Sequence, residues 1–266
     1  MDVTSGLAEV NGTKLHYESA GRGPAVVFLH AGGLDSRMWD DQFAEFAQLY
    51  RVIRYDYRGW GRSEAAPEKF SHLDDLRALL DFLNVETAVL VGATLGGRLA
   101  IDFALAHPRR VWALVLSAPW LSGFQWSESM EKRLAGLLGA TNAGVDKFVQ
   151  GILDDPHFVP APENPAARDK VRRILTENFH NFPAAAADLM APSEKPALGR
   201  LASIGVPTLI CLGGRDHPDL LAVGETLESD IPGAKTVVFF GAGHLVNMEN
   251  PQRFNKTVLE FLAERS

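Results

Sequence analysis

Short runs of apolar residues alternate along most of the chain with longer segments in which apolar residues recur at helical spacing. The short runs predict buried strands at residues 25–29, 50–55, 88–91, 111–116, 207–212 and 235–240. The longer segments predict helices at residues 38–49, 71–83, 98–106 and 251–264. Alternating residues on both sides of Asn11-Gly12 add an antiparallel hairpin over residues 7–18. Repeated strand, turn and helix units are typical of an α/β fold, in which helices cover both faces of a mostly parallel sheet.

The pattern changes between Ser117 and Pro207, where no strand-like run occurs. Helical spacing instead predicts helices at residues 128–138, 145–153, 166–179 and 184–190, separated by prolines. We interpret residues 121–199 as a helical cap, or lid, inserted into a core formed by residues 1–120 and 200–266. Together with the hairpin, the core is expected to contain a sheet of about eight strands.

The bulk composition narrows the range of partners. Over 266 residues the net charge is −7, which argues against binding to nucleic acid or to an anionic membrane surface. A single cysteine, Cys211, excludes an internal disulfide framework and fits a reducing compartment. No secretory signal is visible, and no apolar run approaches the roughly 18 residues that a membrane helix requires. We therefore expect a cytoplasmic protein, and the sequence leaves its oligomeric state open.

The segment around Thr94 carries the strongest chemical signal. The strand predicted at 88–91 ends directly before Gly92, and a helix is predicted shortly after Gly96. This is the layout of a nucleophile elbow, in which flanking glycines let the backbones pack closely while the central side chain projects above the sheet edge. The pattern expects serine at the centre, and this chain has threonine. Thr94 is therefore the candidate nucleophile.

A hydroxyl nucleophile needs a base within hydrogen-bond reach, and a carboxylate must orient that base. Asp216 follows one predicted strand and His244 follows the next, each after glycines. Because parallel strands end at a common edge of the sheet, Thr94, Asp216 and His244 can converge there. His244 would accept the Thr94 proton, and Asp216 would hold the imidazole. Asp219 is the competing candidate for the carboxylate.

An oxyanion hole requires two backbone amides that point at the same position. The amide of Leu95, directly after the nucleophile, is one candidate. The other is expected from the glycine loop after the first parallel strand, where we assign Gly32, with Gly33 as the fallback. We interpret His30 in this loop, and Asp56, Arg58 and Ser63 in a second loop, as bracing groups that shape the site.

Segments 29–33, 38–40, 56–63, 92–96, 213–216 and 243–244 together resemble the α/β-hydrolase superfamily over essentially the whole chain. Within it, the chain is similar to the small esterase and 3-oxoadipate enol-lactonase-like branch. The resemblance implies hydrolysis of a carboxylic ester or lactone through an acyl-enzyme, without a cofactor. Thr94 departs from the family. Its β-branched side chain is disfavoured in the strained elbow by on the order of 1–3 kcal/mol, so we expect reduced turnover.

The nature of the substrate is indicated only by the predicted cap. Large apolar side chains are frequent there, and Trp120 and Phe124 lie where the chain leaves the sheet edge. We assign these two residues to substrate binding. They favour an apolar or aromatic ester or lactone over a highly charged substrate.

Several other functions compete with the hydrolase interpretation. Residues 92–99 match a phosphate-binding loop only in part, because Arg98 and Leu99 stand where lysine and serine or threonine are needed. The histidines show no paired spacing typical of metal ligands. A C–C bond hydrolase or a perhydrolase would use the same triad. A ligand-binding protein on a hydrolase scaffold also stays open, as does an engineered serine-to-threonine replacement at Thr94.

Overall fold

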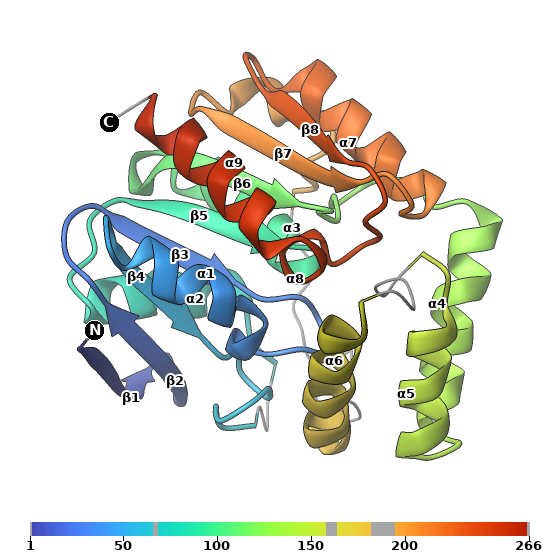
Figure 1. Ribbon diagram of the computed structural model, residues 1–266. Coiled ribbons are helices and arrows are strands. Elements are labelled where there is room, and N and C mark those ends of the chain that lie inside the picture. The colour runs from blue at the N-terminus through green and yellow to red at the C-terminus, as the bar shows by residue number, and fades with distance from the viewer. Residues whose placement is uncertain (1, 66–68, 158–163, 182–194, 265–266) are drawn as a thin grey trace.

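The computed structural model describes residues 2–65, 69–157, 164–181 and 195–264. Its strands form one eight-stranded sheet in the order β1-β2-β4-β3-β5-β6-β7-β8 (Figure 1). The strands are β1 (Val3–Val10), β2 (Thr13–Ala20), β3 (Ala25–Leu29), β4 (Arg51–Tyr55), β5 (Ala88–Ala93), β6 (Val111–Ser117), β7 (Thr208–Gly213) and β8 (Lys235–Phe239). The β1–β2 and β2–β4 pairs are antiparallel, and the other neighbouring pairs are parallel. This confirms the α/β-hydrolase architecture expected from the sequence.

Helices cover both faces of this sheet (Figure 1). The α-helices outside the segment that joins β6 to β7 are α1 (Asp40–Phe46), α2 (His72–Phe82), α3 (Leu95–Ala106), α7 (Pro218–Asp230), α8 (Val246–Glu249) and α9 (Pro251–Ala263). The short 3₁₀ helices are η1 (Ser36–Trp39), η2 (Pro108–Arg110), η3 (Phe179–Asn181) and η4 (Leu201–Ser203). Side chains of α1, α8 and α9 pack into one hydrophobic cluster, and those of α2, α3 and α7 into another.

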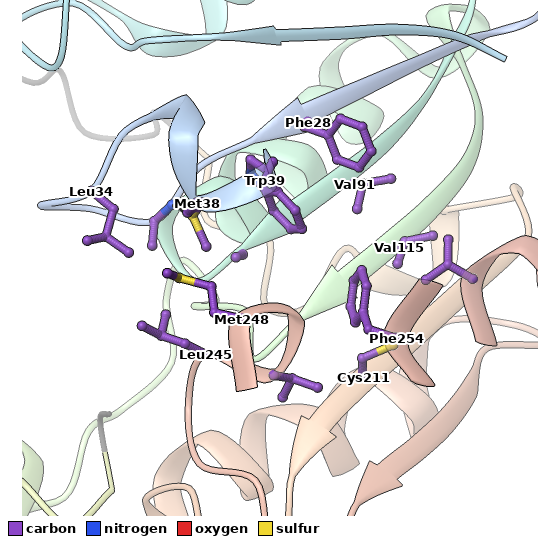
Figure 2. Close-up of a cluster of buried hydrophobic side chains, with 14 of the residues drawn as sticks. Phe28, Leu34, Met38, Trp39, Val91, Val115, Cys211, Leu245, Met248 and Phe254 are labelled. Atoms are coloured by element: carbon purple, nitrogen blue, oxygen red, sulfur yellow. Dashed lines mark hydrogen bonds between the residues drawn. The ribbon is translucent and has the colours of Figure 1, made fainter. Parts of the chain in front are cut away.

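Residue alternation along β3 explains why its sequence is continuously apolar. Val26 and Phe28 point into the cluster beneath α1 and α9, whereas Val27 and Leu29 point into the cluster beneath α2 and α3. Successive strand residues face opposite sides of a sheet, so a strand covered on both sides has no position left for a polar residue. Figure 2 shows part of the first cluster, in which Phe28 lies close to Trp39 of η1.

Several helices differ from the pattern read along the sequence. The helix predicted at 98–106 begins earlier, at Leu95; its first turn contains Gly96 and Gly97, which give no apolar periodicity in the sequence. The segment predicted as one helix at 38–49 is divided into η1 and α1. Helix α7 has no counterpart in the sequence prediction, although its buried residues recur at helical spacing and proline occupies its first turn.

The segment between β6 and β7 contains α4 (Glu128–Thr141), α5 (Val145–Asp154) and α6 (Pro165–Asn178), and no strand among its described residues. These helices correspond to three of the four predicted there, and the fourth, at 184–190, lies outside the described residues. Helices α5 and α6 pack on each other, and Phe148, Ile152 and Ile174 of these helices are buried in one hydrophobic cluster. In Figure 1 the three helices stand beside the edge of the sheet toward which the parallel strands point.

His72, the first residue of α2, is the titratable group whose burial has the clearest consequence for stability. Only 8% of its surface is exposed, and its ring lies 4.9 Å from the rings of both Tyr57 and Phe70. Within the described part of the chain, its Nδ1 has no hydrogen-bond partner. Burial, helped by nearby positive charge, lowers the pKa of His72 from 6.5 to about 3.

We expect His72 to destabilise the fold in acid. The unfolded chain binds a proton on this residue below pH 6.5, whereas the folded chain binds it only near pH 3. As the pH is lowered from about 6.5 to about 3, this residue should therefore reduce the free energy of unfolding by about 1.4 kcal/mol per pH unit. The variant His72→Phe keeps a ring and removes the proton site. In urea unfolding at about pH 7 and about pH 5, its stability should rise relative to the wild type as the pH falls. Parallel pH dependences of the two proteins would contradict this account.

Candidate active site

Thr94 lies in a backbone conformation that threonine rarely adopts. Its φ is +48° and its ψ is −106°, at the point where β5 passes into α3. The Thr94 amide donates to the carbonyl of Ser117 at 3.0 Å, and its carbonyl accepts from the amides of Arg98 at 3.0 Å and Trp120 at 3.1 Å. A β-branched residue in this region is strained by on the order of 1–3 kcal/mol. Such outliers cluster at functional sites, which supports Thr94 as the centre of the site.

Three glycines around Thr94 allow the close packing that this turn requires. A Cβ added to Gly92 would lie 2.3 Å from the carbonyl oxygen of Gly96. One added to Gly96 would lie 2.2 Å from the carbonyl oxygen of Leu29, and one added to Gly97 would lie 2.5 Å from Pro119 Cβ. These distances are too short for any side chain. The glycines of the elbow motif are therefore needed because backbone meets backbone between β3, β5 and α3.

Asp216 and His244 form a buried pair at the same edge of the sheet. His244 Nδ1 donates to Asp216 Oδ2 at 2.8 Å, and the two residues are 2% and 3% exposed. The other carboxylate oxygen of Asp216 accepts from the amide of His217 at 2.7 Å. A proton on Nδ1 leaves Nε2 of the neutral ring as an acceptor. The competing candidate, Asp219, instead accepts from the amide of Ser127 at 2.7 Å. The pairing of His244 with Thr94 stays a prediction.

The loops that carry Asp216 and His244 are in direct backbone contact. A Cβ added to Gly213 would lie 1.8 Å from the carbonyl oxygen of Gly243. Beside this contact, the Arg215 amide donates to the carbonyl of Ala242 at 2.9 Å. The positions of Asp216 and His244 relative to each other therefore depend on glycine at residue 213.

Glu249 supports the loop that carries His244, and it was not among the residues predicted from the sequence. Both of its carboxylate oxygens lie 3.0 Å from the amide of Gly243, directly before His244. Burial raises the pKa of Glu249, and the backbone hydrogen bonds from Gly243 and Leu245 oppose that shift. Only its position six residues after Gly243 could have drawn attention to it.

The two predicted oxyanion amides lie on neighbouring stretches of backbone. Leu95 is the first residue of α3, where helix amides have no carbonyl partner within the helix. A Cβ added to Gly32 would lie 3.6 Å from Leu95 Cδ2. The preceding amide, of Ala31, is already used, because it donates to Met38 Sδ at 3.1 Å. Gly33, the fallback, has a φ of +81°. The assignment of the amides of Gly32 and Leu95 to an oxyanion hole stays a prediction.

His30 uses both ring nitrogens inside the loops. Nδ1 donates to the carbonyl of Ala31 at 2.8 Å, and Nε2 accepts from the amide of Tyr57 at 2.9 Å. The rings of His30 and Tyr57 stack at 3.8 Å. Burial lowers the pKa of His30, so that the neutral form with this tautomer is favoured. These contacts are consistent with the bracing role expected from the sequence.

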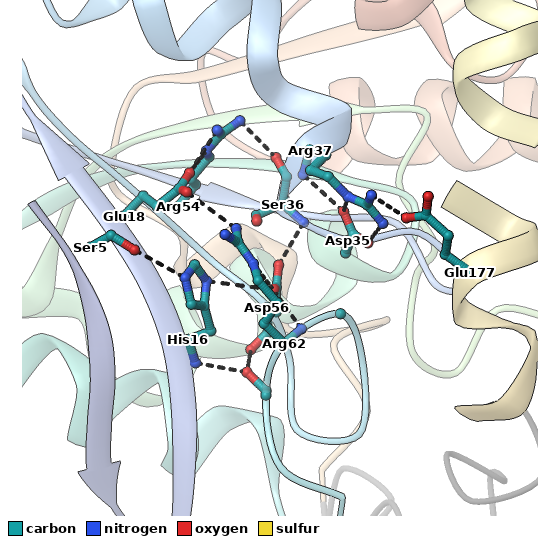
Figure 3. Close-up of polar contacts among 12 residues, drawn as sticks. Ser5, His16, Glu18, Asp35, Ser36, Arg37, Arg54, Asp56, Arg62 and Glu177 are labelled. Carbon is teal, nitrogen blue, oxygen red and sulfur yellow. Dashed lines mark hydrogen bonds and ion pairs between the residues drawn. The ribbon is translucent and has the colours of Figure 1, made fainter. Parts of the chain in front are cut away.

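Asp56 joins the loop after β4 to the loop after β3. Its Oδ1 accepts from the amide of Ser36 at 2.9 Å, and its Oδ2 accepts from the amide of Arg62 at 2.9 Å. Its carbonyl accepts from Ser63 Oγ at 2.6 Å. Figure 3 shows this network, with Asp56 at its centre. Arg58, the third predicted bracing group, pairs with Asp75 at 2.7 Å.

Of the two aromatic residues assigned to substrate binding, Trp120 is hydrogen-bonded to the elbow. The amide of Trp120 donates to the carbonyl of Thr94, as described above. The rings of Trp120 and Phe124 both neighbour Trp126, at 5.8 Å and 5.1 Å. Both residues are partly buried. Their contact with substrate stays a prediction.

Within the described ranges, no group of three or more His, Cys, Asp and Glu side chains could hold a metal ion. The same residues include no helix long and apolar enough to span a bilayer.

Substitution at Gly213 tests the contact between the two loops. We expect Gly213→Ala to lower the free energy of unfolding by about 1–3 kcal/mol, because its methyl group forces the backbone of Gly243 to move. Gly214→Ala is the matched control, since its Cβ would lie no closer than 3.5 Å to its neighbours. It should be neutral or stabilising by up to about 1 kcal/mol. Urea unfolding of the two variants measures the difference, and equal stabilities would refute the role given to this contact.

Comparisons with known proteins agree with the observed fold. The family model described as "alpha/beta hydrolase fold" matches residues 24–251. The chain is 33% identical over 268 residues to a 2-hydroxy-6-oxononadienedioate/2-hydroxy-6-oxononatrienedioate hydrolase of Paraburkholderia phymatum, covering 94% of this chain and 91% of that protein.

Two solved structures are similar over nearly their full length. Est816, an N-acyl homoserine lactone degrading enzyme, has a TM-score of 0.79 and 30% identity, covering 96% of this chain and 100% of that chain. The enol-lactonase from Burkholderia xenovorans LB400 has a TM-score of 0.80 and 26% identity, covering 97% of this chain and 100% of that chain. Because the family model matches residues 24–251 and the relative from Paraburkholderia phymatum is 33% identical over 94% of this chain, the chain belongs to the alpha/beta hydrolase fold family.

Proposed function

We propose that this protein hydrolyses a carboxylic ester or lactone through an acyl-enzyme in which Thr94 is the nucleophile. The observation that carries the proposal is the φ of +48° at Thr94, a β-branched residue held at the turn where the family presents its nucleophile. The buried pair of Asp216 and His244 supplies the base and the group that orients it. The similarity to a lactone-degrading enzyme and to an enol-lactonase supports the substrate class.

In the acylation step, Thr94 Oγ1 attacks the carbonyl carbon of the substrate, and its proton passes to His244 Nε2. Asp216 keeps the proton on Nδ1 and stabilises the imidazolium that forms. The amides of Gly32 and Leu95 donate to the negative oxygen of the tetrahedral intermediate. The alcohol then leaves with the proton from Nε2, and Thr94 stays acylated. In a lactone the leaving alcohol remains part of the acyl group.

Deacylation repeats the same chemistry with water as the nucleophile. His244 Nε2 accepts a proton from water, whose oxygen attacks the acyl carbon. The collapse of the second tetrahedral intermediate returns that proton to Thr94 Oγ1 and releases the carboxylic acid. Residues 121–199 would form a cap over this site. Trp120 and Phe124 would supply apolar contacts to an aliphatic or aromatic acyl group.

A second candidate is hydrolysis of a carbon–carbon bond, which the 33% identity to a named 2-hydroxy-6-oxononadienedioate hydrolase favours. Thr94 Oγ1, with His244 as the base, would then attack a ketone carbonyl instead of an ester carbonyl. A carbon leaving group must be protonated as it departs. The oxygen leaving group of an ester depends less on this protonation. Turnover of a 2-hydroxy-6-oxo-dienoate, compared with p-nitrophenyl esters and small lactones, separates the two functions. A higher kcat/KM for the dienoate than for the esters and lactones would show that the protein hydrolyses a carbon–carbon bond.

The nucleophile can be tested with three proteins on one activated ester. Thr94→Ser removes the methyl group that crowds the attacking oxygen, and misplacement of about 1 Å can reduce a rate on the order of a hundredfold. We expect kcat to rise by at least about tenfold with little change in KM, the signature of an interaction made in the transition state. Thr94→Ala should lower the activity below that of the wild type. Equal rates across the three proteins would refute Thr94 as nucleophile and favour a binding protein on a hydrolase scaffold.

The acid of the triad can be tested with a matched pair of variants. Asp216→Asn would favour the wrong tautomer of His244, and we expect kcat to fall by roughly 10³–10⁴ with a smaller change in KM. Asp219→Asn is the control, because Asp219 bonds to the amide of Ser127 rather than to the imidazole. It should keep kcat within about threefold of the wild type. The opposite ranking of the two variants would show that Asp219 is the acid.

A further inference from the structure

One side chain of α6 is hydrogen-bonded to two loops of the sheet edge. Asn178, the last residue of α6, is only 2% exposed. Its Nδ2 donates to Asp35 Oδ2 at 2.9 Å, and its Oδ1 accepts from the amide of Gly61 at 3.1 Å. Asp35 belongs to the loop after β3, and Gly61 belongs to the loop after β4. The amide of Asn178 therefore joins a helix between β6 and β7 to both loops at once.

Each partner of Asn178 is itself held in a fixed position. Asp35 Oδ1 accepts from the backbone amide of Arg37 at 3.0 Å and from its Nε at 2.9 Å, while Oδ2 accepts from its Nη2 at 2.6 Å. Burial opposes ionisation of Asp35, but the hydrogen bonds and charge of Arg37 outweigh it and keep the pKa of this carboxyl below its usual value. Gly61 has a φ of +54°, and a Cβ there would lie 2.4 Å from Asp56 Oδ2.

Asp35 closes the short loop that carries Gly32. It caps η1, and the amide of Leu34 donates back to the carbonyl of Ala31 at 3.2 Å, so the four residues from 31 to 34 form a tight turn. The next amide, of Ser36, donates to Asp56. Figure 3 shows Asp35, Ser36 and Asp56 in this arrangement, with Arg37 reaching Glu177 of α6. A shift of Asp35 would therefore move the Gly32 amide relative to Leu95.

We infer that Asn178 is a positioning residue that fixes the Gly32 amide for its role in the oxyanion hole, an inference that rests on the proposed function. It acts through Asp35 and Gly61 and does not itself touch the substrate. The side-chain amide of Asn178 is suited to this task because its NH₂ group donates and its oxygen accepts. The NH₂ group matches the carboxylate on one loop, and the oxygen matches the backbone N–H on the other. Neither a hydrophobic residue nor a carboxylate could satisfy both.

A second attachment of α6 provides the matched control. Lys170 Nζ lies 3.3 Å from both Asp40 Oδ2 and Asp41 Oδ2 of α1. Lys170→Ala therefore weakens the attachment of α6 without breaking a hydrogen bond to either loop of the site. Asn178→Ala breaks both hydrogen bonds to these loops.

The experiment compares steady-state kinetics and amide hydrogen exchange of the two variants. Asn178→Ala should lower kcat about tenfold with KM nearly unchanged, because a displaced oxyanion amide weakens binding of the transition state only. It should also speed exchange of the amides of residues 32–36. Lys170→Ala should change neither measurement. Equal effects of the two variants would overturn the inference, since they would show a general role in holding α6.

Asn178→Asp is the alternative test if Asn178→Ala does not fold, because aspartate has nearly the same size and shape as asparagine. The introduced carboxylate would lie at hydrogen-bond distance from Asp35 and from the amide of Gly61, and the charged groups around these partners are Asp56, Arg37 and Glu177. Two carboxylates at hydrogen-bond distance cannot both stay ionised, so binding of a proton restores a donor toward Asp35. The ratio of kcat for this variant to kcat for the wild type should therefore rise as the pH falls from about 8 to about 5. A ratio independent of pH would overturn the inference.

The exchange measurement separates this inference from the proposed function. If the wild type hydrolyses no ester or lactone, the proposed function fails, but faster exchange of residues 32–36 in Asn178→Ala alone would still support the positioning of the loop. If the wild type is active and Asn178→Ala matches it in both kcat and exchange, the proposed function stands and the positioning role is refuted.

Discussion

The close contact of backbone with backbone at the end of β5 is the constraint on which the rest of the candidate site depends. Side chains are excluded from Gly92 and Gly96, where a Cβ would meet carbonyl oxygens at 2.3 Å and 2.2 Å. The chain can therefore change from strand to helix within a single residue, and that residue takes a left-handed φ. The strain at Thr94 is maintained because the strands and the helix on both sides are anchored in the core.

The acid–base pair is built on the same principle. A buried carboxylate is unfavourable unless hydrogen bonds satisfy it, and Asp216 receives one from His244 and one from the amide of His217. These bonds require that two loops on neighbouring strands lie against each other, which the contact of Gly213 with the carbonyl of Gly243 permits. In both parts of the site, glycine contacts set the backbone, and the backbone sets the polar side chains.

Much of the fold could be predicted from the sequence because most of the parallel strands are covered on both faces. In β3, Val26 and Val27 enter different hydrophobic clusters, and this leaves a continuous apolar run in the sequence. The start of α3 could not be predicted, because the glycines after Leu95 are selected for close packing and carry no apolar periodicity. The start of η1 at Ser36 likewise could not be predicted, because the side-chain cap that Asp35 provides there is not revealed by apolar spacing.

The candidate site divides in the same way. Thr94, Asp216 and His244 could be proposed from sequence because each follows a predicted strand and lies near glycines, which leaves a local signature. Asn178 leaves none, since its partner Asp35 lies 143 positions away and a polar residue at the end of a helix is ordinarily a cap or a surface group. The role inferred for Asn178 rests on its two hydrogen bonds, one donated to the first loop and one accepted from the second. Local chain geometry marks the residues proposed to do chemistry, whereas long-range hydrogen bonds determine which residues hold them in place.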